Sequence, residues 1–151
     1  MVEADADHLG IIVEIESKGI IRESNQDNLI DIMRTYYREM IKVPQFPRLL
    51  AQVMYMPESD MQRTLLEKVI NDIAKPMQSF IFDTLAENGV IKPDMAPKIC
   101  RVTYLSLMEF PVIAPPSILG IRGIDLNDAF LEQLLEHNIK LMTGGFLSNK
   151  A

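Results

Sequence analysis

Apolar residues recur at intervals of three and four along most of this 151-residue chain, and proline or glycine ends each such run. Between residues 29 and 41 the spacing is kept over three turns, as on the buried face of an α-helix. Asn25 and Asp27 come just before it with side chains that accept from free backbone amides, whereas Pro44 disfavours helical geometry at Val43. The pattern therefore predicts a helix over residues 29–41.

The longest apolar run predicts one helix of roughly 29 residues, about 43 Å long, between Ser59 and Gly89. Ser59 and Gln62 have the spacing of a capping box, and Gly89 has the usual place of a C-terminal glycine. Pro76 lies inside the run, where it lacks an amide donor and crowds the carbonyl of Asp72. We predict a bend at Pro76 rather than two separate helices.

Two of the remaining helices are predicted from their prolines. A short helix is expected between Pro47 and Pro57. Its buried face should hold Leu49, Leu50, Val53 and Met54. A central helix is expected to have Asp94 as its cap and Pro97 in its first turn, and to end at Pro111 and then at Pro115 and Pro116. This helix is apolar on nearly every side, which is typical of a helix in the middle of a bundle.

The last helix is predicted to begin at Asp125 and to end at Gly144 and Gly145. The segment before it, residues 115–123, is interrupted by glycines and is expected to be a surface loop. A β-branched run at residues 9–21 has no second strand-like segment to pair with, so we predict a helix there as well.

The predicted fold class is therefore all-α, a single-domain bundle of about six helices. The domain is expected to span residues 1–151, with the helical core over residues 28–147 and a separate N-terminal segment over residues 1–27. A chain of this length buries roughly 68–70% of its unfolded surface, so it needs no disulfide or metal to fold.

Charge and cysteine content exclude several kinds of site. The net charge is −6 and the fifteen Lys and Arg are dispersed, which argues against binding a phosphate backbone. The one cysteine, Cys100, allows no internal disulfide and no multi-cysteine metal site. The sequence has no secretory signal and no apolar stretch of roughly 20 residues, so we expect a cytoplasmic protein with no membrane partner.

Catalytic patterns are missing as well. The only imidazoles are His8 and His137, and the chain has neither a glycine-flanked serine nor a phosphate-binding glycine loop. Glu132, Glu136 and His137 lack the repeated Glu-x-x-His pattern of di-iron bundles. We therefore expect no catalytic residue, no metal site and no cofactor.

The apolar residues are of an adaptable kind, since ten methionines and four tyrosines lie along the predicted helices. Methionine changes shape easily to fit different apolar contacts, which favours a pocket for a small hydrophobic molecule; the alternative is that these residues simply fill the core. The tyrosine hydroxyls either orient a ligand or bond to backbone carbonyls. The expected pocket residues are Met33, Tyr37, Met54, Tyr55, Met77, Phe80, Ile81, Tyr104, Met108 and Glu109.

The last helix has an apolar stripe that is wider than one neighbouring helix can cover. A monomer would expose such a patch, so we expect a two-fold homodimer in which two helices from each subunit form a four-helix interface. The expected interface residues are Leu126, Phe130, Leu131, Leu134, Leu135, His137 and Leu141.

Four stretches have a recognisable order: Ala74–Met77, Glu87–Asp94, Leu105–Pro111 with Pro115, and His137–Gly145. In this order the chain resembles the C-terminal regulatory domain of tetracycline-repressor-like (TetR) transcriptional regulators. The resemblance covers about residues 28–147. It implies an all-helical domain that dimerises through its last two long helices and binds an effector in a mainly apolar pocket among the earlier ones.

Members of this family read DNA with an N-terminal helix-turn-helix head, and nothing before Leu29 has the length or basic pattern of such a head. We therefore expect DNA binding only through a head that is absent from this chain, with residues 1–27 as the remainder of the connecting helix. Two other functions stay open. One is a helical homodimeric interaction module without a ligand; the other is a small enzyme, which would need polar groups to converge near His137, Glu109 or Tyr104.

Overall fold

The computed structural model describes residues 25–148, except for the side chains of residues 73–79. The predicted helix at residues 9–21 and the side chain of Met77 lie outside this description. The described part is all-α and contains no strand, which confirms the predicted fold class. Its helices are α2 (Gln26–Lys42), α3 (Gln45–Met54), α4 (Met61–Val69), α5 (Lys75–Glu87), α6 (Pro97–Ile113), α7 (Pro116–Ile121) and α8 (Asp128–Gly144), and a π-helical turn, η1 (Ile70–Ala74), joins α4 to α5.

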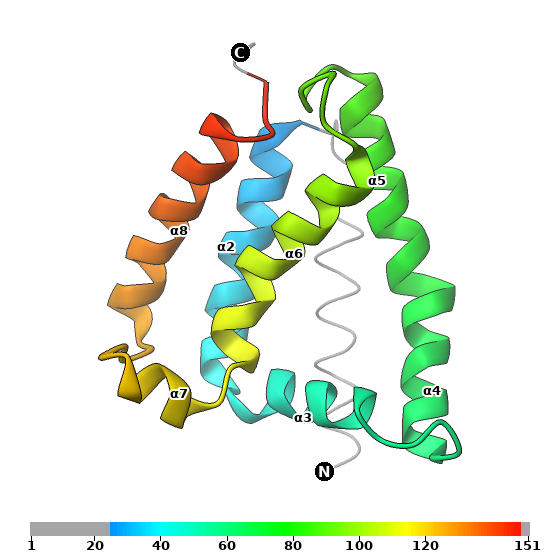
Figure 1. Cartoon of the computed structure of the whole chain (residues 1–151), viewed down its shortest axis with the longest axis vertical. Helices are drawn as coiled ribbons and strands as arrows, with labels where there is room; N and C mark the ends of the chain where they lie inside the picture. The colour runs from blue at the N-terminus through cyan, green and yellow to red at the C-terminus, as the bar shows by residue number, and fades with distance from the viewer. Residues whose placement is uncertain (1–24, 149–151) are drawn as a thin grey trace.

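The helices form a bundle with α2 and α6 between two outer rods (Figure 1). One outer rod is α8 and the other is the continuous run of α4, η1 and α5; α3 and α7 close the same end of the bundle. Helix α2 packs against α6 and α8, and α6 packs against α3 and α5. The core therefore lies around α2, whose buried residues include Leu29, Ile32, Met33, Tyr36, Tyr37 and Met40.

Helix α2 confirms the prediction made from its apolar spacing. The side chain of Asn25 caps it by accepting from the amides of Asp27 and Asn28 at 2.9 and 3.2 Å. The helix ends at Lys42, just before Val43 and Pro44. Local sequence is sufficient here because the cap, the periodic face and the terminating proline all act within one helix.

The long rod runs without a break from α4 through η1 into α5 (Figure 1), which confirms one continuous run rather than two separate helices. The bend predicted at Pro76 stays a prediction. The π-helical turn at Ile70–Ala74 stands just before Pro76, and such turns are a common device where the regular hydrogen-bond ladder is interrupted. The cap was predicted one residue too early. Asp60, not Ser59, accepts from the amides of Gln62 and Arg63 at 2.8 and 3.3 Å.

Gly89 ends the rod in the predicted manner. Its φ is 72°, a left-handed conformation that glycine adopts without strain. Val90 N donates to Leu85 O at 2.9 Å and Gly89 N donates to Ala86 O at 3.1 Å, which together form a Schellman motif. Beyond this turn, an isolated bridge pairs Ile91 with Leu147 and thereby ties the turn to the segment after α8.

Helix α6 continues through Pro111 to Ile113 and ends just before Pro115 and Pro116, so the prediction was wrong for Pro111 and is confirmed for the second stop. A proline removes the amide that would bond the carbonyl four residues earlier, which here belongs to Leu107. Two other helices supply the missing donors. The Tyr37 hydroxyl donates to Leu107 O at 2.7 Å, and the Asn138 amide lies 3.5 Å from the same oxygen. The orphaned carbonyl is thus satisfied without interrupting α6.

Several helix starts also differ from the predictions. Residues 116–121 form α7 rather than a loop, with Pro116 in the first turn, where its missing amide costs nothing. Asn127, not Asp125, caps α8 by accepting from Phe130 N at 2.9 Å. Pro97 does start α6, but the cap position is Ala96 and Asp94 makes no cap bond.

Two predictions of burial were wrong. On α3, Met54 is exposed, and Phe46 and Pro47 are buried with Val53 instead. Helix α6 is not covered on every side, because Ile99 is 66% exposed and Phe110 is 57% exposed. The reason is its place in the bundle, where α2, α3 and α5 contact it but the outward face meets no described helix.

Candidate functional site

Helices α6 and α8 each carry a stripe of side chains that their own bundle covers only in part; on α8, Phe130 and Leu134 are half-buried. On α8 the stripe consists of Phe130, Leu134, His137 and Leu141, and on α6 of Ile99, Thr103, Ser106 and Phe110. Both follow the same spacing of four, three and four residues, which keeps each stripe on one side of its helix. Leu141 is 48% exposed and Ile99 is 66% exposed. We call these residues the α6–α8 face.

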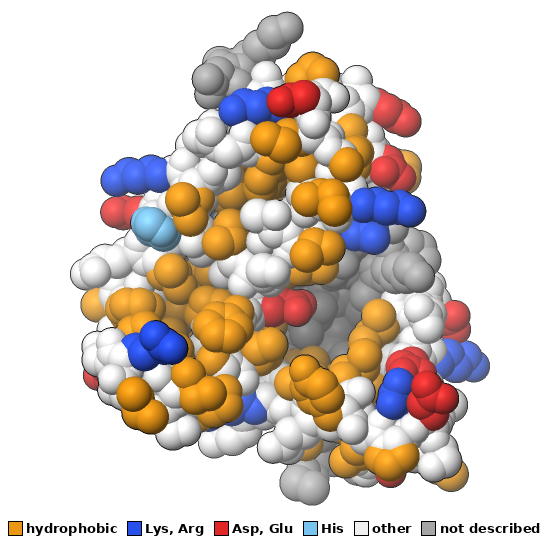
Figure 2. All heavy atoms as spheres, in the orientation of Figure 1, with side chains coloured by type: hydrophobic (Ala, Val, Ile, Leu, Met, Phe, Trp, Pro, Cys, Tyr) orange, Lys and Arg blue, Asp and Glu red, His pale blue; other side chains and the backbone are white. Residues whose placement is uncertain are grey.

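Figure 2 shows hydrophobic side chains gathered over α6, α7 and α8 on one side of the molecule. Helix α7 adds two exposed residues, Ile118 and Ile121. A soluble monomer rarely exposes a contiguous apolar patch of more than a few hundred Å². The α6–α8 face therefore has the character of an interaction surface.

The structure divides the seven predicted interface residues into two groups. Leu131 and Leu135 are buried within the bundle, where α8 packs against α2. Phe130, Leu134, His137 and Leu141 lie on the α6–α8 face, and Leu126 is half-buried just before α8. The sequence stripe was wide because it contained both sets, one for the core and one for the surface.

The ten predicted pocket residues are also separated. Met33, Tyr37, Ile81, Tyr104 and Met108 are buried in the core. Met54, Tyr55 and Phe80 are exposed, and Tyr55 is 91% exposed beyond the end of α3. The hydroxyls of Tyr37 and Tyr104 donate to the backbone carbonyls of Leu107 and Leu29. The tyrosine hydroxyls were expected either to orient a ligand or to bond to backbone carbonyls, and Tyr37 and Tyr104 do the second.

Glu109 and Tyr36 form a polar pair between α6 and α2. Burial raises the pKa of Glu109, which is half-buried on α6. Burial and then the negative charge of Glu109 raise the pKa of the Tyr36 phenol. Neither side chain has a hydrogen-bond or ion-pair partner among the residues that the structure describes. Within the described part of the chain, Glu109 is thus a partly buried carboxyl without a basic partner, and burial of a charged group is costly.

Glu109 lies on one flank of α6 among apolar side chains. On α6, Val102 and Leu105 precede Glu109 by seven and four residues, and Ile113 follows it by four. The three side chains therefore lie on the same flank of the helix as Glu109. That flank is distinct from the stripe of the α6–α8 face. Glu109 is thus the one charged group in an otherwise apolar strip.

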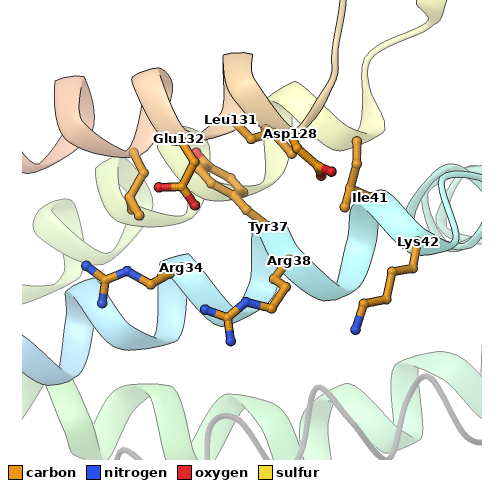
Figure 3. Close-up of a pocket in the computed structure, with 9 residues that line it drawn as sticks. Arg34, Tyr37, Arg38, Ile41, Lys42, Asp128, Leu131 and Glu132 are labelled. Carbon is orange, nitrogen blue, oxygen red and sulfur yellow. The ribbon is translucent and has the colours of Figure 1, made fainter.

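A groove of about 290 Å³ lies between α2 and α8. Figure 3 shows Arg34, Arg38 and Lys42 along α2, and Asp128 and Glu132 on α8. Its floor includes Tyr37, Ile41, Leu131 and Leu135. The basic residues are spaced by four on α2 and the acidic residues by four on α8, so charges of opposite sign face the groove from its two walls. This arrangement of charges was not predicted from the sequence, although the spacing of four residues on each helix could have indicated it.

The described residues show no cluster of three or more His, Cys, Asp or Glu that could hold a metal ion. His137 lies exposed on α8, and Cys100 is buried, where burial raises the pKa of its thiol. Within residues 25–148 no helix combines the length and apolar character needed to cross a membrane.

The sequence matches no protein-family model, and no curated protein is significantly similar to it. The functional argument therefore depends on the two surfaces described above, the α6–α8 face and the groove between α2 and α8.

Proposed function

We propose that this chain is a homodimerising, effector-binding regulatory domain of the kind found in TetR-like transcriptional regulators. The observation that carries the proposal is the exposure of Ile99 and Phe110 on α6 and of Leu141 on α8, the two longest helices of the second half of the chain. These are the helices through which the resemblance implies dimerisation. A two-fold axis beside them would place two helices of each subunit in one four-helix interface.

Burial of the α6–α8 face would supply the driving force for pairing. Each Å² of apolar surface removed from water contributes about 25 cal/mol, and a standard interface buries about 800 Å² on each partner. Much of the stripe on α8 is aliphatic or aromatic, and its one titratable group, His137, stands between Leu134 and Leu141. Such composition suits the core of an interface better than open solvent.

The effector-binding part of the proposal is supported by the groove of about 290 Å³ between α2 and α8, which Tyr37, Leu131 and Leu135 line together with charged side chains. A pocket for a small molecule is typically apolar with a few polar groups that orient the ligand. In this proposal the domain works in the cytoplasm and reaches DNA only through a separate head, because a net charge of −6 opposes direct contact with phosphates.

The second candidate function is a homodimeric interaction module without a ligand. It is favoured by the burial of Met33, Tyr37 and Met108, three predicted pocket residues that fill the core instead. Both candidates require the same dimer, so they differ only in whether the chain binds a small molecule.

The dimer is tested with Leu141→Glu. The variant places a charge in the centre of the proposed interface, whereas in a monomer Leu141 is 48% exposed and tolerates the change. We expect the wild type to sediment at twice the mass of one chain and the variant to sediment as a folded monomer, with a dissociation constant raised about 100-fold or more. Unchanged helical circular dichroism would show that the fold is intact.

The matched control is Leu65→Glu, which makes the same substitution on α4, where Leu65 is 58% exposed. This variant should remain a dimer. Dimers formed equally well by Leu141→Glu and the wild type, or a monomeric wild type at micromolar concentration, would refute the α6–α8 interface.

A further inference from the structure

The groove between α2 and α8 has walls of opposite charge and an apolar floor. Its basic wall is the side of α2 that carries Arg34, Arg38 and Lys42, and its acidic wall is the side of α8 that carries Asp128 and Glu132 (Figure 3). A ligand in this groove would therefore meet a positive potential on one side and a negative potential on the other.

Arg38, in the middle of the basic wall, has no counter-ion among the residues that the structure describes. Its two neighbours on that wall are paired within α2. Arg34 lies 2.8 Å from Asp31, and Lys42 lies 3.0 Å from Glu39. Arg38 is exposed and makes no such ion pair or side-chain hydrogen bond. Its charge is therefore available to a ligand in the groove.

The acidic wall is also unpaired. Asp128 and Glu132 are exposed, and neither forms an ion pair or a side-chain hydrogen bond within residues 25–148. In particular, no ion pair joins Arg38 to either carboxylate across the groove. The space between the two walls is therefore open to a third group that contacts both.

The size and charge of the groove define the class of ligand. Its volume of about 290 Å³ is close to the lower limit of small-molecule pockets, which suits a compact molecule. An anion would be attracted by Arg38 but repelled by the acidic wall, and a cation would meet the reverse. A molecule with one charge of each sign and an apolar part matches both walls and the floor.

Resting on the effector-binding part of the proposed function, we propose that the α2–α8 groove binds an apolar α-amino acid in its zwitterionic form. The guanidinium of Arg38 donates two parallel hydrogen bonds to the ligand carboxylate. The ligand ammonium donates to the carboxylate of Glu132, and Asp128 adds to the negative potential of that wall. The apolar side chain of the amino acid lies over the floor, beside Tyr37 and Leu131.

The test compares three probes that share a phenyl ring and differ in charge: L-phenylalanine, 2-phenylethylamine and 3-phenylpropanoate. Each is titrated into the full-length chain at neutral pH, and binding is followed by the NMR shifts of backbone amides. We expect phenylalanine to bind about fivefold or more tightly than either singly charged probe, since an ion pair at a partly exposed site is worth up to roughly that factor. The shifted amides should lie on α2 and α8.

Two variants separate the contributions of the walls. Arg38→Gln should weaken phenylalanine and phenylpropanoate about fivefold and should not weaken phenylethylamine. Glu132→Gln should weaken phenylalanine and phenylethylamine by a similar factor and should not weaken phenylpropanoate. Both side chains are exposed, so the helical circular dichroism of the variants should equal that of the wild type.

The matched controls remove the same charges outside the groove. Arg122→Gln follows α7, and Glu136→Gln lies on α8; both side chains are exposed and neither lines the groove. Each control should bind all three probes as the wild type does. A loss of phenylalanine binding in the controls as large as in Arg38→Gln and Glu132→Gln would show a general effect of charge and overturn the inference.

The other failures are distinct. Equal affinity for the three probes, or a phenylalanine preference that survives both groove variants, overturns the inference while leaving an apolar effector site in place. Binding of none of the three also refutes it. The effector-binding part of the proposed function is then decided by thermal unfolding with the neutral compounds octanol and indole, where a raised melting temperature supports it and an unchanged one counts against it. The dimer is judged separately, by sedimentation.

Discussion

Asn138→Asp is expected to lower the free energy of unfolding by about 3–5 kcal/mol. Asn138 is 1% exposed, and its amide donates to the Tyr37 hydroxyl at 2.8 Å. The Tyr37 hydroxyl in turn donates to Leu107 O, the carbonyl that Pro111 leaves without an amide. An aspartate at this position has no hydrogen to donate and places a negative charge beside a carbonyl oxygen. The substitution therefore weakens the contacts of α8 with both α2 and α6.

Urea unfolding followed by circular dichroism measures this loss, at one fixed protomer concentration because dimerisation adds to apparent stability. Asn138→Leu is the matched control; it has similar volume and no charge, and should cost about 1–3 kcal/mol. Lowering the pH protonates the introduced carboxyl, whose pKa burial raises, so the difference between the aspartate variant and the wild type should shrink in acid. A loss below that of Asn138→Leu at neutral pH would show that the network is not buried.

Leu85→Ala is expected to cost about 2–5 kcal/mol of stability. Leu85 is 0% exposed near the end of α5, and its carbonyl accepts from Val90 in the turn that ends the helix. Alanine keeps that backbone bond and the helix, so the loss reports the removed side chain and the cavity that it leaves. The same urea titration gives the value.

Leu65→Ala on the exposed side of α4 is the control for this substitution. It removes the same atoms from a side chain that already contacts water, and should change stability by about 0.5 kcal/mol or less. Similar losses for the two variants would mean that the core is not centred where α2, α5 and α6 meet.

Features that depend on neighbouring residues could be predicted from the sequence. Helix α2 required only its periodic face, the Asn25 cap and Pro44, all of which lie within one segment. Gly89 was recognisable because a left-handed turn after a long helix favours glycine. The all-α class follows from such local signals repeated along the chain.

Features that depend on residues far apart in the sequence could not be predicted. Pro111 was read as a helix end because a lone helix would leave Leu107 O unbonded. The donors that satisfy it come from Tyr37 and Asn138, which are 70 and 31 residues away in sequence. Similarly, Asp125 and Asn127 are both good caps, and the choice between them depends on how α8 packs.

For the candidate surfaces too, only the features that depend on neighbouring residues could be predicted. Periodicity identified the stripe on α8, but it could not separate Leu131 and Leu135, which face α2, from Leu134 and Leu141, which face outward. Glu109 was recognised as a charge in an apolar helix. Its electrostatic effect on Tyr36 depends on the packing of α6 against α2, which the sequence does not display.

The account depends most on the claim that the α6–α8 face joins two copies of this chain, and a cysteine scan of α8 tests it directly. In a two-fold interface the same stripe of both subunits meets at the axis, so single cysteines there can oxidise to a covalent dimer. We predict cross-linking at one or more of the stripe positions, tested with Phe130→Cys, Leu134→Cys, His137→Cys and Leu141→Cys, and none with Glu132→Cys, Glu136→Cys or Lys140→Cys. Cross-linking confined to the second set, or absent at all seven positions, would contradict the account.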